Sequence, residues 1–347
     1  MYSPILAGIK ALFMKKIMLA SILLLGANAH AQYNSKNLSM ESSESANKYH
    51  FKNLQLYPIR ANSNFFNEIK DNGNYLSLKE GLDSKKILIT EKTDTSSHRL
   101  QNNRVNSNNI EQQYVSEGTV NTLFIENISS DTVMVLAGEV VKGGKQDRVI
   151  AQDFLLYPRS GKKDVSVFCV EHGRWSTDDK TFSFRTTSTI SCPSVRKAAA
   201  VDKEQGKVWD NVANVTSKNK ASTNTGTYNA LEKSDSYNKE LDEYLKHLGN
   251  LFNSDPSVIG VVAVSGDSII GCDMFASNGM FKKYYGSLLN SYATEAITNG
   301  KEVKVSYQRV SNYLNSFIVS EEKQEEVIKS KGTQLKEGRK KVHISVY

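Results

Sequence analysis

Three β-rich runs follow one another within residues 133–175 and leave few options for the fold. The runs are Val133–Ala137, Val149–Tyr157 and Val165–Val170. Gly, Pro, Lys and Asp residues separate them, a composition typical of neighbouring strands joined by turns. We therefore expect this stretch to form a β-meander around which the rest of the chain is organised.

Two polar segments adjoin these runs. They are the connection Gly143, Gly144, Lys145, Gln146, Asp147 and Arg148 after the first run, and the set Glu171, His172, Arg174 and Trp175 after the third. In an antiparallel meander, the first connection and the end of the third strand lie at the same edge. The sequence therefore predicts that the two segments converge on one ligand site, although it does not identify the ligand.

The glycine-rich connection allows two interpretations. The N–H groups of Gly143, Gly144 and Lys145 either form a nest that binds a phosphate or carboxylate, or belong to an ordinary glycine-rich turn. The segment is not a Walker loop, because it lacks the Lys-Ser/Thr ending and a following helix. Gln146 beside it is a further candidate ligand contact.

Arg148 and Arg174 are candidate ligand contacts because a planar guanidinium group binds phosphate or carboxylate through two hydrogen bonds. The alternative is that both arginines are structural and form ion pairs, with Glu139 and Glu171 as the partners. In that case the site would be a network that holds the fold.

Glu171 is the candidate catalytic residue, as a general acid or base. A joint role with His172 requires the strand to have ended, because neighbours on a strand point to opposite faces. Trp175 is either a stacking platform for a ligand or a partly buried aromatic at a strand end. Asp273 follows a second hairpin and either reaches the site or caps a turn.

Motifs of metal and cofactor sites are absent from the sequence. The histidines after residue 31 lack the spacing of zinc ligands, and no CxxC pair occurs. Neither a GxSxG elbow nor a GxGxxG that opens a helix is present. We therefore expect no metal and no cofactor.

The N-terminus has the pattern of a secretory signal peptide. Lys15 and Lys16 precede the apolar run 17–25, and residues 29–31 have the small-x-small pattern of a cleavage site. We expect cleavage after Ala31, which leaves a secreted or periplasmic chain without a stable membrane span. The alternative is an uncleaved membrane anchor.

The net charge gives only a weak argument about partners. The formal charge is +7, and the first 31 residues hold three lysines and no acidic residue, so the mature chain would carry +4. No basic stripe with interleaved aromatic residues stands out. We interpret the charge as a solvated surface and expect no nucleic-acid partner.

Strands dominate the first half of the sequence, whereas helices and strands alternate in the second. The elements expected there are helices at 194–215, 237–252, 279–298 and 321–331 and a hairpin at 258–272. This order favours an α+β fold, with an antiparallel or mixed β-sheet core and helices mainly in the C-terminal half. The expected parts are a signal peptide at 1–31, a flexible lead-in at 32–48 and a single domain at 49–347.

Three cysteines follow the signal peptide: Cys169, Cys192 and Cys272. Export permits disulfides, but an odd count leaves at least one thiol unpaired. Cys169 and Cys272 lie in apolar β-like runs, so we expect both to be buried and reduced.

Several motifs together resemble a known family. They are Gly138-Glu139, Gly144-Lys145-Gln146-Asp147-Arg148, Cys169-Val170-Glu171-His172-Gly173-Arg174-Trp175, Arg196, Val208-Trp209, Asp273-Met274-Phe275 and Val342-His343-Ile344. They resemble the ARPP-1 domain, which is associated with ADP-ribosylglycohydrolase and rhodanese-phosphatase proteins and was formerly a domain of unknown function. The resemblance covers about Phe51 to Tyr347. Asp147 departs from the Asn that is more usual there, and Glu204-Gln205 replaces a Ser-Gln pair.

The resemblance implies a ligand class and no particular reaction. The proteins with which the family is associated in genomes suggest ligands derived from ADP-ribose or NAD. We therefore expect an exported protein that binds, or binds and processes, an anionic small ligand such as ADP-ribose or another phosphorylated sugar. The alternative is a non-catalytic envelope or interaction module with a structural polar motif. The site expected for the first hypothesis comprises Glu171 as the catalytic residue and, as ligand contacts, Gly144, Lys145, Gln146, Arg148, Arg174, Trp175 and Asp273.

Overall fold

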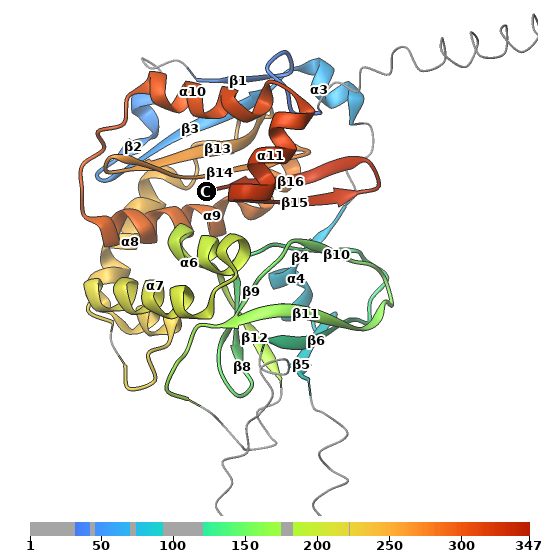
Figure 1. Ribbon diagram of the computed structural model, residues 1–347, viewed down its shortest axis with the longest axis vertical. Helices are drawn as coiled ribbons and strands as arrows, with labels where there is room; N and C mark the ends of the chain where they lie inside the picture. The colour runs from blue at the N-terminus through green and yellow to red at the C-terminus, as the bar shows by residue number, and fades with distance from the viewer. Residues whose placement is uncertain (1–31, 42–45, 70–73, 93–120, 175–182, 222) are drawn as a thin grey trace, which may run out of the picture. The chain divides into compact units, whose positions relative to one another are not determined.

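The computed structural model in Figure 1 describes most of the chain from Gln32 onward. The described residues are 32–41, 46–69, 74–92, 121–174, 183–221 and 223–347. The expected signal peptide, most of the polar segment after Glu91, and Trp175 lie outside these ranges, so the predictions about them stay predictions.

Within the described residues, seven strands form the larger sheet, and all of its pairs are antiparallel. The order is β1 (Leu38–Met40), β3 (Leu54–Ala61), β13 (Val258–Ser265), β14 (Ser268–Phe275), β16 (Lys340–Val346) and β15 (Gly332–Glu337), with β2 (His50–Phe51) paired to β3. The expected hairpin is confirmed as β13–β14. Gly266 at its turn has a φ of +59°, which favours glycine. Every residue of β13 is buried, as expected for a strand covered on both faces.

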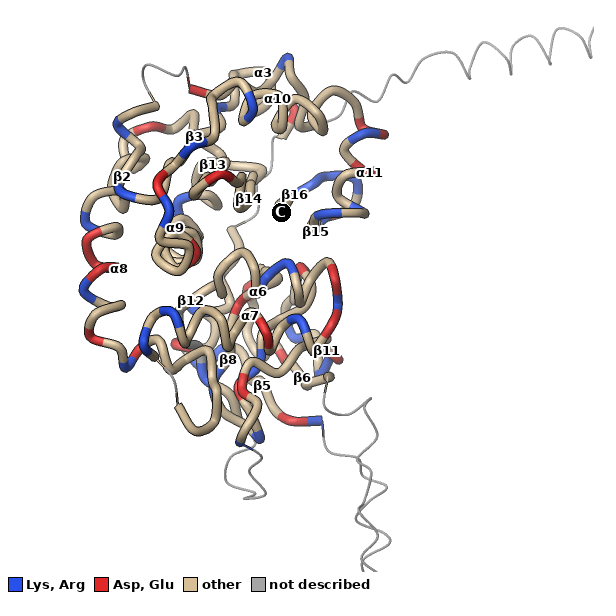
Figure 2. Tube along the Cα trace, turned by 60° about the vertical axis from the view of Figure 1, so that its left-hand side comes forward, with Lys and Arg blue, Asp and Glu red and all other residues tan. Residues whose placement is uncertain are grey.

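The helices lie mainly in the C-terminal half. They are the short α3 (Ser63–Glu68) and α4 (Leu78–Asp83), then α6 (Pro193–Lys197), α7 (Gln205–Lys218), α8 (Asp235–Leu248), α9 (Asn278–Asn299), α10 (Tyr307–Ile318) and α11 (Glu321–Lys331). A serine side chain caps the N-terminus of each helix from α8 to α11. Helix α9 packs on β13 and β14 through apolar residues at helical spacing, including Phe281, Leu288 and Tyr292. Basic and acidic residues are interspersed along α8 and α11 (Figure 2).

Two helix predictions differ from the structure. The expected helix at 194–215 is divided into α6, a π-helical turn (Ala198–Asp202) and α7, because Lys203 adopts a left-handed φ of 56°. Helix α10 was not predicted. Its buried residues Val310, Leu314 and Phe317 have helical spacing, but most residues between them are polar.

The second sheet has six described strands and closes on itself. Its order is β12 (Phe184–Ile190), β8 (Glu139–Gly143), β9 (Arg148–Ile150), β11 (Gly161–Cys169), β6 (Thr122–Asn127) and β5 (Ile87–Glu91). An antiparallel bridge between Thr90 and Ser183 brings β5 beside β12. Alternate residues of these strands, such as Ile89, Ile125 and Val167, form an apolar cluster of their own. The sheet is therefore a small barrel with a filled interior.

The expected three-stranded meander is wrong in part. The run Val149–Tyr157 is two strands, β9 and β10 (Phe154–Leu156), and β10 joins β7 (Val133–Val135) and β4 (Leu76–Ser77) in a third sheet. Strand β8 was not expected. The chain changes sheet at Asp153, whose carboxylate accepts bonds from the Ala137 N–H (2.6 Å) and the Thr333 hydroxyl (2.8 Å). These bonds hold the connection in an irregular conformation.

The expected convergence of the two polar segments is confirmed by the strand register. Arg148 is opposite Cys169 across β9 and β11, and opposite Val141 across β9 and β8. The N–H of Val170 donates to the carbonyl of Asp147 at 3.0 Å. The residues that follow β11 therefore lie beside the β8–β9 connection.

The α+β class is confirmed, with antiparallel and mixed sheets and with the longer described helices in the C-terminal half. All three cysteines are buried free thiols, as expected for Cys169 and Cys272. In the part of the chain that the structure describes, no helix has both the length and the apolar character that a membrane crossing requires.

Candidate functional site

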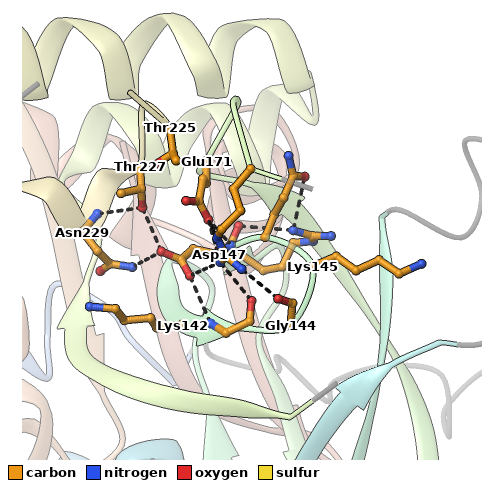
Figure 3. A network of polar contacts seen from close by, with 12 residues as sticks. Lys142, Gly144, Lys145, Asp147, Glu171, Thr225, Thr227 and Asn229 are labelled. Carbon is orange, nitrogen blue, oxygen red and sulfur yellow. Dashed lines mark hydrogen bonds and ion pairs between the residues drawn. The ribbon is translucent and has the colours of Figure 1, made fainter. Parts of the chain in front are cut away.

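A cleft of about 780 Å³ lies where the β8–β9 connection meets the residues after β11. Segments from far along the chain complete its walls, namely β12 and residues 223–233. Figure 3 shows the polar network at its floor, with Asp147 in the centre and Thr227 and Asn229 on one side. The cleft therefore lies at the predicted place, but more segments build it than the sequence indicated.

Asp147 is buried at the floor of the cleft, and its carboxylate accepts four hydrogen bonds. Oδ1 accepts from the N–H of Gly143 (3.0 Å) and from Nη2 of Arg174 (3.1 Å). Oδ2 accepts from Thr227 Oγ1 (2.8 Å) and Asn229 Nδ2 (2.7 Å). Since each oxygen already has two donors, this carboxylate holds the loop and leaves no ready acceptor for a ligand.

Arg174 is an internal cross-link. Its Nε donates to Glu171 Oε2 (2.9 Å), Nη1 to the carbonyl of Gly144 (2.9 Å), and Nη2 to the carbonyl of Gly143 (3.3 Å) and to Asp147. Burial lowers the pKa of Arg174, but its bonds and charge interactions with Glu171 and Asp147 outweigh burial and raise that pKa. The structure therefore agrees with the alternative that Arg174 is structural and forms an ion pair with Glu171.

The glycine-rich connection is not a nest for an external anion. The N–H of Gly144 donates to the carbonyl of Ser183 (3.3 Å), and that of Lys145 donates to Glu91 Oε1 (2.6 Å). The N–H of Gly143 is bonded to the floor carboxylate described above. The protein's own acceptors therefore occupy the donors that a nest would present to a ligand.

Close packing explains the second glycine of this connection. Gly144 has a φ of +53°, and an added Cβ would lie 2.2 Å from the Phe184 ring and 2.5 Å from the Glu91 carboxylate. Any side chain there would collide with the end of the barrel interior. Glycine is required by packing and by backbone conformation, independently of a ligand.

Arg148 lies fully buried at the end of the barrel and does not line the cleft. Its Nη1 contacts Gln146 Oε1 (3.5 Å) and the carbonyl of Asp147 (3.4 Å), and its nearest carboxylate is Glu91 at 3.9 Å. Nε and Nη2 have no hydrogen-bond partner among the described residues. The expected pairing with Glu139 is wrong, because Glu139 instead accepts from the N–H of Leu136 (2.7 Å). Gln146 and Lys145 are likewise absent from the cleft lining.

Glu171 lines the cleft and points away from its neighbour in sequence. Its Oε2 accepts from the N–H of Asp147 (3.1 Å) and from Arg174, whereas Oε1 accepts no hydrogen bond from any described residue. The ring of His172 packs edge-on against Trp209, with centroids 4.6 Å apart. Strand β11 ends at Cys169, before both residues, but their side chains still diverge and form no acid–base pair.

Three basic residues at the cleft were not predicted. Lys142 on β8 is directly opposite Arg185 on β12, and Lys233 comes from the 3₁₀ helix Tyr228–Lys233. Lys142 has an exposed ion pair with Glu232 at 3.2 Å. The sequence held no spacing signal for this group, because the three residues come from separate segments.

Asp273 belongs to a second network and not to the cleft. It is fully buried, and its carboxylate accepts two bonds from Arg196 (3.1 and 2.9 Å), one from His343 Nε2 (3.0 Å) and one from the Tyr292 hydroxyl. The prediction that Asp273 reaches the Glu171 site is corrected by this placement. Arg196 and His343 are among the residues that carry the family resemblance, but no pattern in the sequence predicted that they contact Asp273.

His343 links this second network to the irregular connection between β9 and β10. Its Nδ1 lies 3.2 Å from Asp153 Oδ2, so the imidazole is bonded to a carboxylate on each side. Burial lowers the pKa of His343, but Asp153 and Asp273 outweigh burial and raise it to about 9. Burial raises the pKa of nearby Glu139 to about 8. The network thus connects the larger sheet to the barrel side of the fold.

These observations define an α+β protein with a cation-rimmed polar cleft and a separate buried charge network. Among the described residues, no group of three or more His, Cys, Asp or Glu is placed to hold a metal ion.

The chain belongs to the ARPP-1 family. The model of the ARG and Rhodanese-Phosphatase-superfamily-associated Protein domain matches residues 43–345, which is nearly the whole chain. Neither a curated protein nor a solved structure matches it.

Proposed function

We propose that this is an exported protein whose cleft binds an anionic small ligand, such as ADP-ribose or another phosphorylated sugar. The observation that carries the proposal is the position of Arg185 directly opposite Lys142 on neighbouring strands of the cleft wall. Like charges at opposite positions destabilise a sheet. The exposed Lys142–Glu232 ion pair offsets this repulsion only weakly, and a bound anion would relieve the rest.

The charge balance of the cleft supports the same proposal. Arg174 is bonded to both floor carboxylates, Asp147 and Glu171, and offsets one of their two formal negative charges. Arg185 and Lys233 are exposed and form no ion pair with any described residue. The cleft therefore has a positive rim above a rigid polar floor, which suits a phosphoryl group.

Glu171 is the group that would act on a bound ligand if a reaction takes place. Its Oε1 is the cleft carboxylate oxygen without a hydrogen bond to a described residue, so it can accept a proton or a ligand hydroxyl. Arg148 and Asp273 stabilise the fold and do not contact the ligand in this proposal, because both are buried away from the cleft. Trp175 stays a candidate contact outside the described residues.

One observation favours a second function. The floor network of Asp147, Glu171 and Arg174 is almost fully bonded within the protein. A non-catalytic envelope or interaction module, with a structural polar motif, would need such a network and would not need a ligand.

Isothermal titration calorimetry with ADP-ribose and ribose 5-phosphate separates the two functions. Charge-assisted hydrogen bonds contribute roughly 1.5–3 kcal/mol each, so Arg185→Ala should weaken binding about tenfold or more. The melting temperature should change little, because Arg185 is exposed. The matched control is Arg339→Ala, which removes an exposed arginine in the β15–β16 turn, outside the cleft. No binding of either ligand, or equal losses in both variants, would favour the interaction module.

A further inference from the structure

No described lining residue of the cleft is aromatic or purely aliphatic. Every lining residue is charged, carries a hydroxyl or amide group, or is glycine. No described aromatic or aliphatic side chain faces the cleft. From the described residues, a ligand there meets cations, hydrogen-bonding groups and the carbon stems of these side chains, but no aromatic ring.

Among the described residues, the aromatic residues nearest the cleft lining in sequence are directed elsewhere. Phe184 lies between the lining residues Ser183 and Arg185, but its ring is buried in the barrel interior. Tyr228 follows the lining residue Thr227, but its ring is buried in the main core and its hydroxyl accepts from the N–H of Cys192 at 2.9 Å. Strand alternation along β12 turns the Phe184 ring away from the ligand space, and Tyr228, at the start of a 3₁₀ helix, packs into the core.

A nucleobase is bound by stacking on an aromatic ring, which none of the described lining residues provides. Stacking on an aromatic side chain typically strengthens binding of a base by roughly 5- to 150-fold. The volume of about 780 Å³ is large enough for a nucleotide-sized ligand. Discrimination against a nucleobase would therefore depend on the chemistry of the lining and not on its size.

A phosphorylated sugar matches the groups that are present. Lys142, Arg185 and Lys233 supply the cationic rim for a phosphoryl group. The hydroxyl of Thr225 and Oε1 of Glu171, which accepts no hydrogen bond from a described residue, can pair with sugar hydroxyls.

We infer that the cleft selects sugar phosphates that carry no nucleobase. This inference rests on the proposed function and narrows it, because it predicts that the adenosine part of ADP-ribose adds little to the binding affinity. The phosphoryl group would occupy the cationic rim, and the sugar would lie over the polar floor.

Calorimetric titration of the mature chain tests the inference with ribose 5-phosphate, ADP-ribose, inorganic phosphate and adenosine. We expect ribose 5-phosphate to bind within about threefold of ADP-ribose, and adenosine not to bind. Thr225→Val should weaken binding of ribose 5-phosphate about threefold or more and leave binding of inorganic phosphate unchanged, because a neutral hydrogen bond contributes roughly 0.5–1.5 kcal/mol. An unchanged melting temperature would show that this variant is folded.

Two results would overturn the inference, and they are distinguishable. If ADP-ribose binds more than about tenfold tighter than ribose 5-phosphate, the proposed function stands but the base is recognised. Loss of that advantage in Trp175→Ala would identify Trp175 as the stacking surface. If none of the phosphates binds, the proposed function and the inference both fail.

Discussion

Replacement of Asp273 by Asn tests whether the second network is structural. The carboxylate accepts four hydrogen bonds from Arg196, His343 and Tyr292, and the side chains of Arg196, Asp273 and His343 are at most 1% exposed. An amide has one acceptor oxygen where the carboxylate has two, and it carries no charge. The substitution therefore leaves a buried guanidinium without its counter-ion.

The expected loss of stability follows from this burial. Breaking a buried ion pair by removal of one partner typically costs about 3–5 kcal/mol. In a domain of this size each kcal/mol lowers the melting temperature by about 2 °C or slightly more. We therefore expect Asp273→Asn to lower the melting temperature by on the order of 10 °C.

Thermal unfolding followed by circular dichroism, with urea titration at one temperature, measures the effect. Asp267→Asn is the control, because it changes an exposed aspartate in the turn of the same β13–β14 hairpin and should cost no more than about 0.5 kcal/mol. Ligand affinity of the folded fraction should not change, since Asp273 does not line the cleft. An unchanged melting temperature, with or without a loss of affinity, would refute the structural role.

The remaining predictions concern the cleft, the pH dependence and the N-terminus. Arg174→Ala should lower both the melting temperature and ligand affinity, because two buried carboxylates lose their shared cation; an unchanged melting temperature would contradict this. Urea titrations should show stability falling as pH rises from about 5 to about 9, because the pKa of Glu139 is raised from 4.5 to about 8 and that of His343 from 6.5 to about 9. Each residue contributes its full stabilisation below its pKa in the unfolded chain and loses that stabilisation as the pH rises through its pKa in the folded protein. His343→Gln should reduce the slope above about pH 6.5, and a flat wild-type profile would contradict the assignment. N-terminal sequencing of the secreted or periplasmic protein should begin at or near Gln32, whereas an intact N-terminus in the cytosol would exclude export.

Local patterns in the sequence were sufficient for several features. Apolar runs on both sides of Gly266-Asp267 predicted the β13–β14 hairpin, and helical spacing predicted α8, α9 and α11. The order of strands and turns also predicted that the β8–β9 connection would meet the residues after β11. These predictions held because they depend on short-range periodicity and on antiparallel geometry, both of which are properties of neighbouring residues.

Only the tertiary structure decided what each polar residue does. Arg148 and Arg174 look alike in the sequence, but one is buried at the end of the barrel and the other cross-links the floor of the cleft. Asp273 lies near His343 because β14 pairs with β16, and Lys142 lies near Arg185 because β8 pairs with β12. Burial and hydrogen-bond partners depend on contacts between distant segments, which no local pattern contains. The sequence by itself therefore determined where polar residues gather, and the packing of the sheets determined which of them face a ligand and which hold the fold.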